Sequence, residues 1–128
     1  MDEFTISIPR ERPFAAVAGL VVSGIAARHD VTLDVLDDLQ LALDGLLERD
    51  DEDEGQVTIE VRVDGGVIAA VIGPVTASTA AELKEEAGES LGLRRVLEAV
   101  VDSVTLAERD GGSWVELRKG FVLAGETA

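Results

Sequence analysis

Alternating apolar and polar side chains, or continuous apolar runs, mark five short segments of the chain as strands. These segments are Phe4–Ile8, Val57–Val63, Val67–Ile72, Val104–Leu106 and Trp114–Leu117. Val67–Ile72 is apolar on both faces, which predicts a central place in a sheet, and Gly73-Pro74 is expected to end this strand. Asp64-Gly65-Gly66 and Asp110-Gly111-Gly112 have the composition of tight turns, so they predict two hairpins.

Four other segments have the apolar spacing or the capping residues of helices. They cover about 13–28, 33–47, 79–87 and 93–101. Pro13 suits the first turn of the first helix, and Thr32 is a suitable N-cap for the second. Thr79-Ala80-Ala81-Glu82 resembles a capping box for the third helix. The fourth helix is expected to direct three residues inward: Val96, Leu97 and Val100.

The order of these elements predicts an α+β fold with two layers. One layer of helices packed on one face of a mixed sheet would bury the apolar faces of both. The sequence shows no internal repeat and no linker that would divide it. We therefore expect residues 1–128 to form a single domain.

Composition excludes several classes of function. Eleven basic and 26 acidic residues give a net charge of −15, so the chain is expected to repel nucleic acid and anionic membrane surfaces. It has no cysteine and one histidine, which excludes disulfides, thiolate metal sites and multi-histidine metal sites. The acidic start, Met1-Asp2-Glu3, is unlike that of a signal peptide, and it predicts a cytoplasmic protein.

Two runs in the predicted first and second helices resemble a known bacterial family. They are Leu20-Val21-Val22-Ser23-Gly24-Ile25-Ala26-Ala27-Arg28 and Asp38-Leu39-Gln40-Leu41-Ala42-Leu43, with Thr32 and Asp34 between them. These runs are similar to the anti-sigma factor serine kinases, small members of the histidine-kinase-like (GHKL) ATPase superfamily. Ser90-Leu91-Gly92-Leu93 and Val100-Val101-Asp102-Ser103-Val104 match later parts of the family pattern. The resemblance implies a two-layer sandwich of the histidine-kinase-like (Bergerat) ATPase type.

The same alignment places unsuitable residues where the family binds and activates ATP. A glutamate that activates the attacking hydroxyl corresponds to Gly45, and an asparagine that binds Mg²⁺ corresponds to Arg49. An aspartate that hydrogen-bonds adenine corresponds to Val71. Gly73 and Gly92 are what remains of the nucleotide site. The resemblance therefore implies a protein that has lost kinase activity and needs no cofactor.

A surviving serine kinase with an altered site and weak binding of ATP and Mg²⁺ is the alternative. A shift of the alignment by one residue would make Asp44 the catalytic acid, but it would also place Glu48 at the metal position. That shift would move the Asp38-Leu39 match out of frame. An exposed carboxylate on a polar helix face is the more ordinary role for Asp44.

The resemblance also implies partners. Family members bind a sigma factor, or an antagonist of the anti-sigma factor, through the surface at the start of the first helix. Here that surface would comprise Arg10, Glu11, Arg12 and Phe14. The family forms dimers through its first strand, so a homodimer is expected. A structural role as the dimerisation partner of an active paralogue is a further alternative.

Four other features have ordinary structural explanations. His29, between two predicted helices, suits a surface or capping role, and Trp114 suits a core or sheet face, with partner anchoring as its alternative. Arg94-Arg95 is more simply a pair of solvated side chains than a phosphate contact. The acidic run from Asp50 to Glu54 fails as a calcium loop because Val61 stands where a bidentate glutamate is required.

Overall fold

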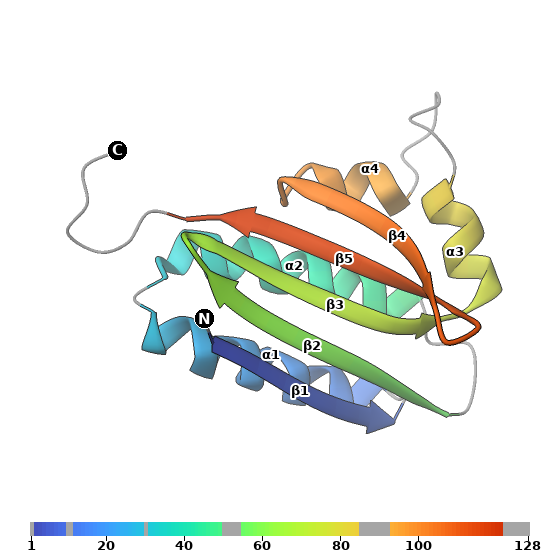
Figure 1. Ribbon diagram of the computed structural model, residues 1–128, viewed down its shortest axis with the longest axis horizontal. Helices are drawn as coiled ribbons and strands as arrows, with labels where there is room; N and C mark the ends of the chain where they lie inside the picture. The colour runs from blue at the N-terminus through green and yellow to red at the C-terminus, as the bar shows by residue number, and fades with distance from the viewer. Residues whose placement is uncertain (1, 10–11, 30, 50–54, 85–92, 122–128) are drawn as a thin grey trace.

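A computed structural model describes residues 2–9, 12–29, 31–49, 55–84 and 93–121 (Figure 1). Its five strands are β1 (Asp2–Pro9), β2 (Gln56–Asp64), β3 (Val67–Val75), β4 (Ser103–Arg109) and β5 (Gly112–Gly120). Its four helices are α1 (Arg12–Arg28), α2 (Leu33–Arg49), α3 (Ala77–Lys84) and α4 (Leu93–Glu98). Within the described ranges the elements follow the predicted order, and no helix there is long and apolar enough to cross a membrane.

The strands form one sheet in the order β1-β2-β3-β5-β4, so the strand that is apolar on both faces is central, as predicted. The expectation of a mixed sheet is wrong, because all four pairings between described strands are antiparallel. The chain leaves β3 through α3 and α4 and enters β4, which runs in the same direction as β3. The β4–β5 hairpin then places β5 between β3 and β4. These two parallel strands are therefore not neighbours, and each pairs with the antiparallel β5 instead.

The helices cover one face of the sheet and leave the other open, as Figure 1 shows with α1 and α2 behind the strands. Alternate strand residues point to the helices: Val57, Ile59 and Val61 of β2, Ile68, Ala70 and Ile72 of β3, and Val115 and Leu117 of β5. They pack against Leu39, Leu43 and Leu46 of α2, which form one fully buried stripe. The core therefore lies between the two predicted layers.

Three local predictions are wrong. Gly73-Pro74 does not end β3: the register shifts between Ile72 and Val75, which accommodates a proline without an N–H, and Val75 then pairs with Ser113. Thr79 is not the cap of α3, because it lies buried within the helix and its own N–H donates to the Thr76 hydroxyl at 3.2 Å. Val96 points outward and is 52% exposed, since α4 ends at Glu98 and buries Leu93 and Leu97 instead.

Candidate functional site

The residues that carry the family resemblance hold the first two helices together. The side-chain amide of Gln40 donates hydrogen bonds to the Gly19 carbonyl at 3.0 Å and to the Ser23 hydroxyl at 2.7 Å. The Thr32 hydroxyl accepts a bond from the Val35 N–H at 3.4 Å, so Thr32 caps α2 as predicted. These contacts are structural: they join α1 to α2 and cap the start of α2.

Gly45 and Val71, two residues of the expected nucleotide site, lie on opposite sides of the sheet. Gly45 is half-buried on α2, in the helical layer. Val71 lies in β3 between Glu60 and Glu116, and its neighbour Ile72 is fully buried against the helices. Since side chains alternate along a strand, Val71 points to the open face. The structure does not bring these two residues together.

Two further residues of that site lie outside the described part of the chain. Arg49 is the last residue of α2, and its side chain is outside the description. Gly92 lies in the undescribed range 85–92. Most of the expected partner surface is also outside the description. Arg10 and Glu11 fall outside the described residues, and Arg12 and Phe14 are placed in α1 by their backbone alone.

Gly73 is packed against an aromatic ring. A Cβ atom at this position would lie 2.6 Å from Cγ and 2.7 Å from Cε3 of Trp114, which is closer than real Cβ atoms approach a ring. The ring comes from β5, where Trp114 stands opposite the irregular end of β3. Glycine at position 73 is therefore explained by the tryptophan that covers it.

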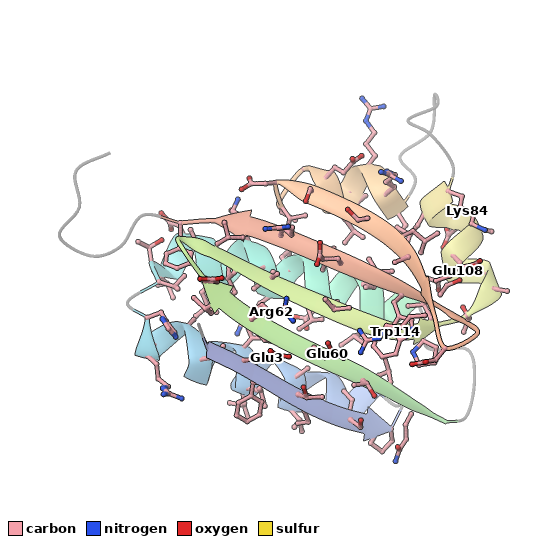
Figure 2. The ribbon with its side chains drawn as sticks, viewed as in Figure 1. Glu3, Glu60, Arg62, Lys84, Glu108 and Trp114 are labelled. Atoms are coloured by element: carbon pink, nitrogen blue, oxygen red, sulfur yellow. The ribbon has the colours of Figure 1, made fainter. Side chains whose placement is uncertain are left out.

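Trp114, Arg109 and Glu60 form a cluster on the open face of the sheet. Figure 2 labels Trp114 and Glu60 on this face. The Arg109 guanidinium lies 4.4 Å from the centre of the Trp114 ring. The same guanidinium bonds both carboxylate oxygens of Glu60, at 2.5 and 3.4 Å. The hydrogen bond to Glu60 raises the pKa of Arg109 above its ordinary value. The guanidinium is therefore a fixed positive charge beside the ring.

The cluster explains how a tryptophan can lie on a sheet face that no helix covers. Trp114 is 8% exposed, because Gly73 leaves room beneath the ring and Arg109 covers it from above. The sequence predicted that Trp114 is a core or sheet-face residue, and the structure places it on the sheet face. Sequence reasoning missed Arg109 and Glu60, since 49 residues separate them and neither belongs to a motif.

Two further ion pairs lie on the open face of the sheet. Arg62 lies 3.7 Å from Glu3, and Arg118 lies 3.9 Å from Glu116, both across exposed ion pairs. With Arg109 and Glu60, these pairs place three positive and three negative side chains on this face, and Asp64 of β2 adds one more carboxylate. Most of the net charge of −15 is therefore carried elsewhere.

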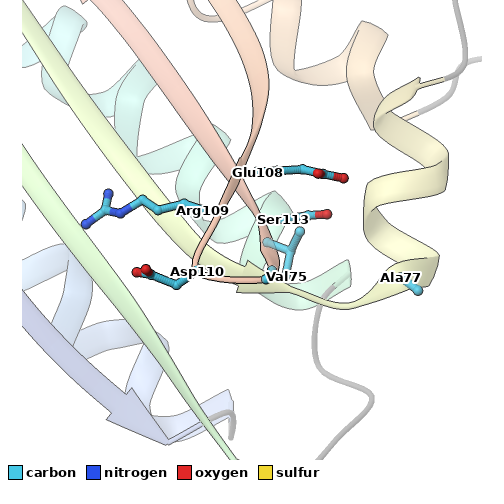
Figure 3. A pocket seen from close by; sticks show the side chains of 8 residues that line it. Val75, Ala77, Glu108, Arg109, Asp110 and Ser113 are labelled. Carbon is cyan, nitrogen blue, oxygen red and sulfur yellow. The ribbon is translucent and has the colours of Figure 1, made fainter.

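A shallow pocket of about 430 Å³ lies at the end of the β4–β5 hairpin (Figure 3). Its walls are Val75, Ala77 and the stretch from Glu108 to Ser113. Asp110 turns the chain with a φ of 53°, and Gly111 follows with a φ of 79°. Neither Gly45 nor Val71 lines the pocket, and among the described residues no three acidic or histidine side chains group as a metal site would require.

Arg94 holds α4 in place. Its guanidinium donates to the Leu83 carbonyl at 2.9 Å and to the Val104 carbonyl at 3.2 Å, which ties α3 and β4 to α4. Lys119 of β5 also joins separate parts of the fold. It donates to the Val100 carbonyl at 2.9 Å and pairs with Asp38 of α2 at 3.1 Å. The structure thus gives Arg94 a bonded structural role, which differs from both a solvated side chain and a phosphate contact.

Comparison with known proteins identifies the fold. No protein-family model matches the chain, and no curated protein matches it. Twelve solved chains match, among them the crystal structure of the RsbU and RsbW domains of Rv1364c from Mycobacterium tuberculosis, with a TM-score of 0.67 and 15% identity. That match covers 94% of this chain and 32% of the other, so the chain spans about a third of that structure. The chain has the two-layer sandwich fold of the histidine-kinase-like type.

Proposed function

We propose that this chain is a regulatory protein of the anti-sigma type, which binds a sigma factor or an anti-sigma antagonist and does not transfer phosphate. The sandwich fold and the sequence pattern of α1 and α2 support the assignment to this class. The observation that supports the loss of kinase activity is the structure at the end of β3, where Val71 and Gly73 align with the family's nucleotide site. There the strand continues through Gly73 to Val75, and the Trp114 ring lies on Gly73.

Three replacements support the same proposal. Gly45 has no side chain to accept a proton, and Arg49, as a cation, cannot bind Mg²⁺. Val71 has no polar atom to bond adenine, and it faces away from the helical layer. A protein that keeps the fold of a kinase without these groups retains its surfaces as the means of acting on a partner.

ATP is expected to bind at least 100-fold more weakly than at a micromolar nucleotide site. Two lost polar contacts to charged or buried groups, at about 1.5–3 kcal/mol each, account for that factor. Calorimetric titration with Mg-ATP measures it, with ADP and GTP as comparisons. Binding in the low micromolar range would contradict the proposal and favour the alternative of a surviving kinase.

A host sigma factor, or an antagonist, is expected to bind this chain more tightly than about 10 µM at physiological salt, a free energy near −7 kcal/mol. The net charge of −15 would steer the chain to the basic DNA-contacting surface of a sigma factor. Raising the salt should therefore weaken the complex, because the Debye length shortens. Reversing the charges of Arg10 and Arg12 should abolish binding if those residues anchor the partner.

The measurement is affinity by interferometry for each host sigma factor and antagonist, at two salt concentrations. If none binds below about 10 µM, the anti-sigma proposal is dropped in favour of a structural partner for an active paralogue. The Arg10 and Arg12 reversals locate the interface, and their failure to act would move it to another surface.

A homodimer through β1 is expected at tens of micromolar. In the described sheet β1 pairs with β2 alone, so its other side offers backbone groups to a second copy. Phe4, on this strand, is 46% exposed. Sedimentation should show a dimer that dissociates at least tenfold more readily in Phe4→Lys, since a lysine on an edge strand opposes pairing. A monomer at all concentrations would exclude this assembly.

A further inference from the structure

The outer face of the α1–α2 pair has an apolar centre. The bonds from Gln40 to Gly19 and Ser23 fix the two helices side by side at this level. Leu20 and Leu41 are the next residues on each helix, and they are 73% and 63% exposed. Both side chains therefore stand on the outer side of the same helix–helix contact, away from the sheet.

The part of this face that belongs to α1 carries no charge, and at Gly24 it has no side chain. From Pro13 to Ala27 the helix has no acidic or basic residue. Gly24, one turn after Leu20, is exposed, and nothing lies within 4 Å of the position its Cβ would take. A helix that is apolar on all sides is ordinarily buried, whereas this one leaves a side uncovered.

The part that belongs to α2 is acidic. Asp37 and Asp34, one and two turns before Leu41, are exposed on the same side of the helix. Their neighbour Asp38 is directed to Lys119, at 3.1 Å, so it is occupied within the fold. The apolar centre thus has a row of carboxylates along one border and an uncharged helix along the other.

We propose that this outer face, the Leu20–Leu41 surface, docks an amphipathic helix of the partner protein. The apolar side of that helix would lie on Leu20 and Leu41, and its lysine or arginine side chains would face Asp34 and Asp37. The inference rests on the proposed function for the statement that the partner is a regulatory protein. It adds the chemistry by which that partner is recognised.

Charge selects this occupant over others. A second copy docked on this face would bring another row of carboxylates against Asp34 and Asp37. Nucleic acid and anionic membranes are repelled for the same reason. A helix suits the surface better than a strand does. The side-chain ridges of two packed helices can accept a third helix, whereas a strand needs free backbone groups to pair with, and helices offer none.

The test uses a fluorescent synthetic helix of leucine and lysine at amphipathic spacing, with anisotropy as the readout at physiological salt. The double variant Leu20→Ser, Leu41→Ser is expected to weaken binding at least tenfold. Val96→Ser is the matched control, because Val96 is 52% exposed on α4, and it should leave the affinity unchanged. Circular dichroism of each variant establishes that it is folded.

A second pair of variants separates recognition from general attraction to an acidic protein. Asp34→Asn with Asp37→Asn should weaken binding at least fivefold and reduce its salt dependence. Asp64→Asn with Glu108→Gln removes the same charge from exposed sites on the sheet and should have little effect. Equal effects of the two pairs, or binding that survives the loss of both leucines, would overturn the proposal.

The outcomes also separate this inference from the proposed function. If the peptide binds at the Leu20–Leu41 surface and no sigma factor or antagonist binds, the anti-sigma function fails and the docking surface stands. If a sigma factor binds with the same affinity to the Leu20→Ser, Leu41→Ser variant, the docking surface fails alone. If the double variant turns a dimer into a monomer in sedimentation, the occupant is a second copy and the proposal is wrong.

Discussion

Replacing Gly73 with alanine is expected to destabilise the protein by about 3 kcal/mol, the upper part of the usual cost of overpacking. The new methyl group would overlap the Trp114 ring, which lies between β3 and the Arg109 guanidinium, so the ring or the strand would have to shift. For a chain of this length the loss corresponds to a decrease in Tm of about 10 °C. Thermal unfolding followed by circular dichroism measures it.

Gly24→Ala and Gly45→Ala are the controls for this prediction. Both glycines lie in helices, and nothing stands within 4 Å of the position of an added Cβ. Alanine in a helix is more favourable than glycine by up to about 1 kcal/mol, so these variants should be as stable as the parent or more stable. If Gly73→Ala had the same Tm as these two controls, the Trp114 ring would move aside at little cost, and the prediction would be wrong.

The fluorescence of the chain reports on the same contact, because Trp114 is its one tryptophan and it has no tyrosine. In the parent protein the indole is almost fully buried, so its emission should shift to longer wavelength on unfolding. In Gly73→Ala a displaced ring would shift the emission before unfolding begins. This spectral change distinguishes a local displacement from a general loss of stability.

The strands and helices were predictable wherever one face of an element is apolar. Val57–Val63 and the leucines of α2 alternate with polar residues at the periods of a strand and a helix, and burial follows these periods. The central place of β3 followed from its apolar residues on both faces. These features depend on sequence neighbours, so a single chain contains the information.

Features that depend on distant residues were not predictable. Whether the sheet is mixed or antiparallel depends on where the β4–β5 hairpin inserts, and no local pattern records that position. The continuation of β3 past Pro74 depends on Ser113 of β5, which pairs with Val75. Thr76 and Thr79 are both acceptable caps by composition, and the burial of Thr79 decided between them.

The candidate nucleotide site illustrates the same limit. Alignment identified Gly73 as a remnant of the nucleotide site, because it compares residue types along one chain. The structure shows a different reason for that glycine, a tryptophan 41 positions later in the sequence. The open face of the sheet, with its three ion pairs, has no counterpart in any short motif, since its partners come from four strands.

Replacing Trp114 with alanine is expected to cost about 3–5 kcal/mol, as for other buried large aromatic residues. The indole is 8% exposed, and its removal leaves Gly73 without a covering group and Arg109 without its aromatic contact. Trp114→Phe should retain part of the burial and lose less. Arg109→Ala should cost less than either, because its side chain is 45% exposed and exposed ion pairs contribute little. Urea unfolding followed by circular dichroism gives all three values.

The combined variant Gly73→Ala, Trp114→Ala should be more stable than the sum of the two single effects implies. With the ring removed, the methyl group at position 73 has free space, so its added cost in the Trp114→Ala background should fall below about 1 kcal/mol. The cycle would then give a coupling of about 2 kcal/mol between residues on two strands. Strict additivity would show that Gly73 is required by its backbone alone, and that the ring does not explain why this position holds a glycine.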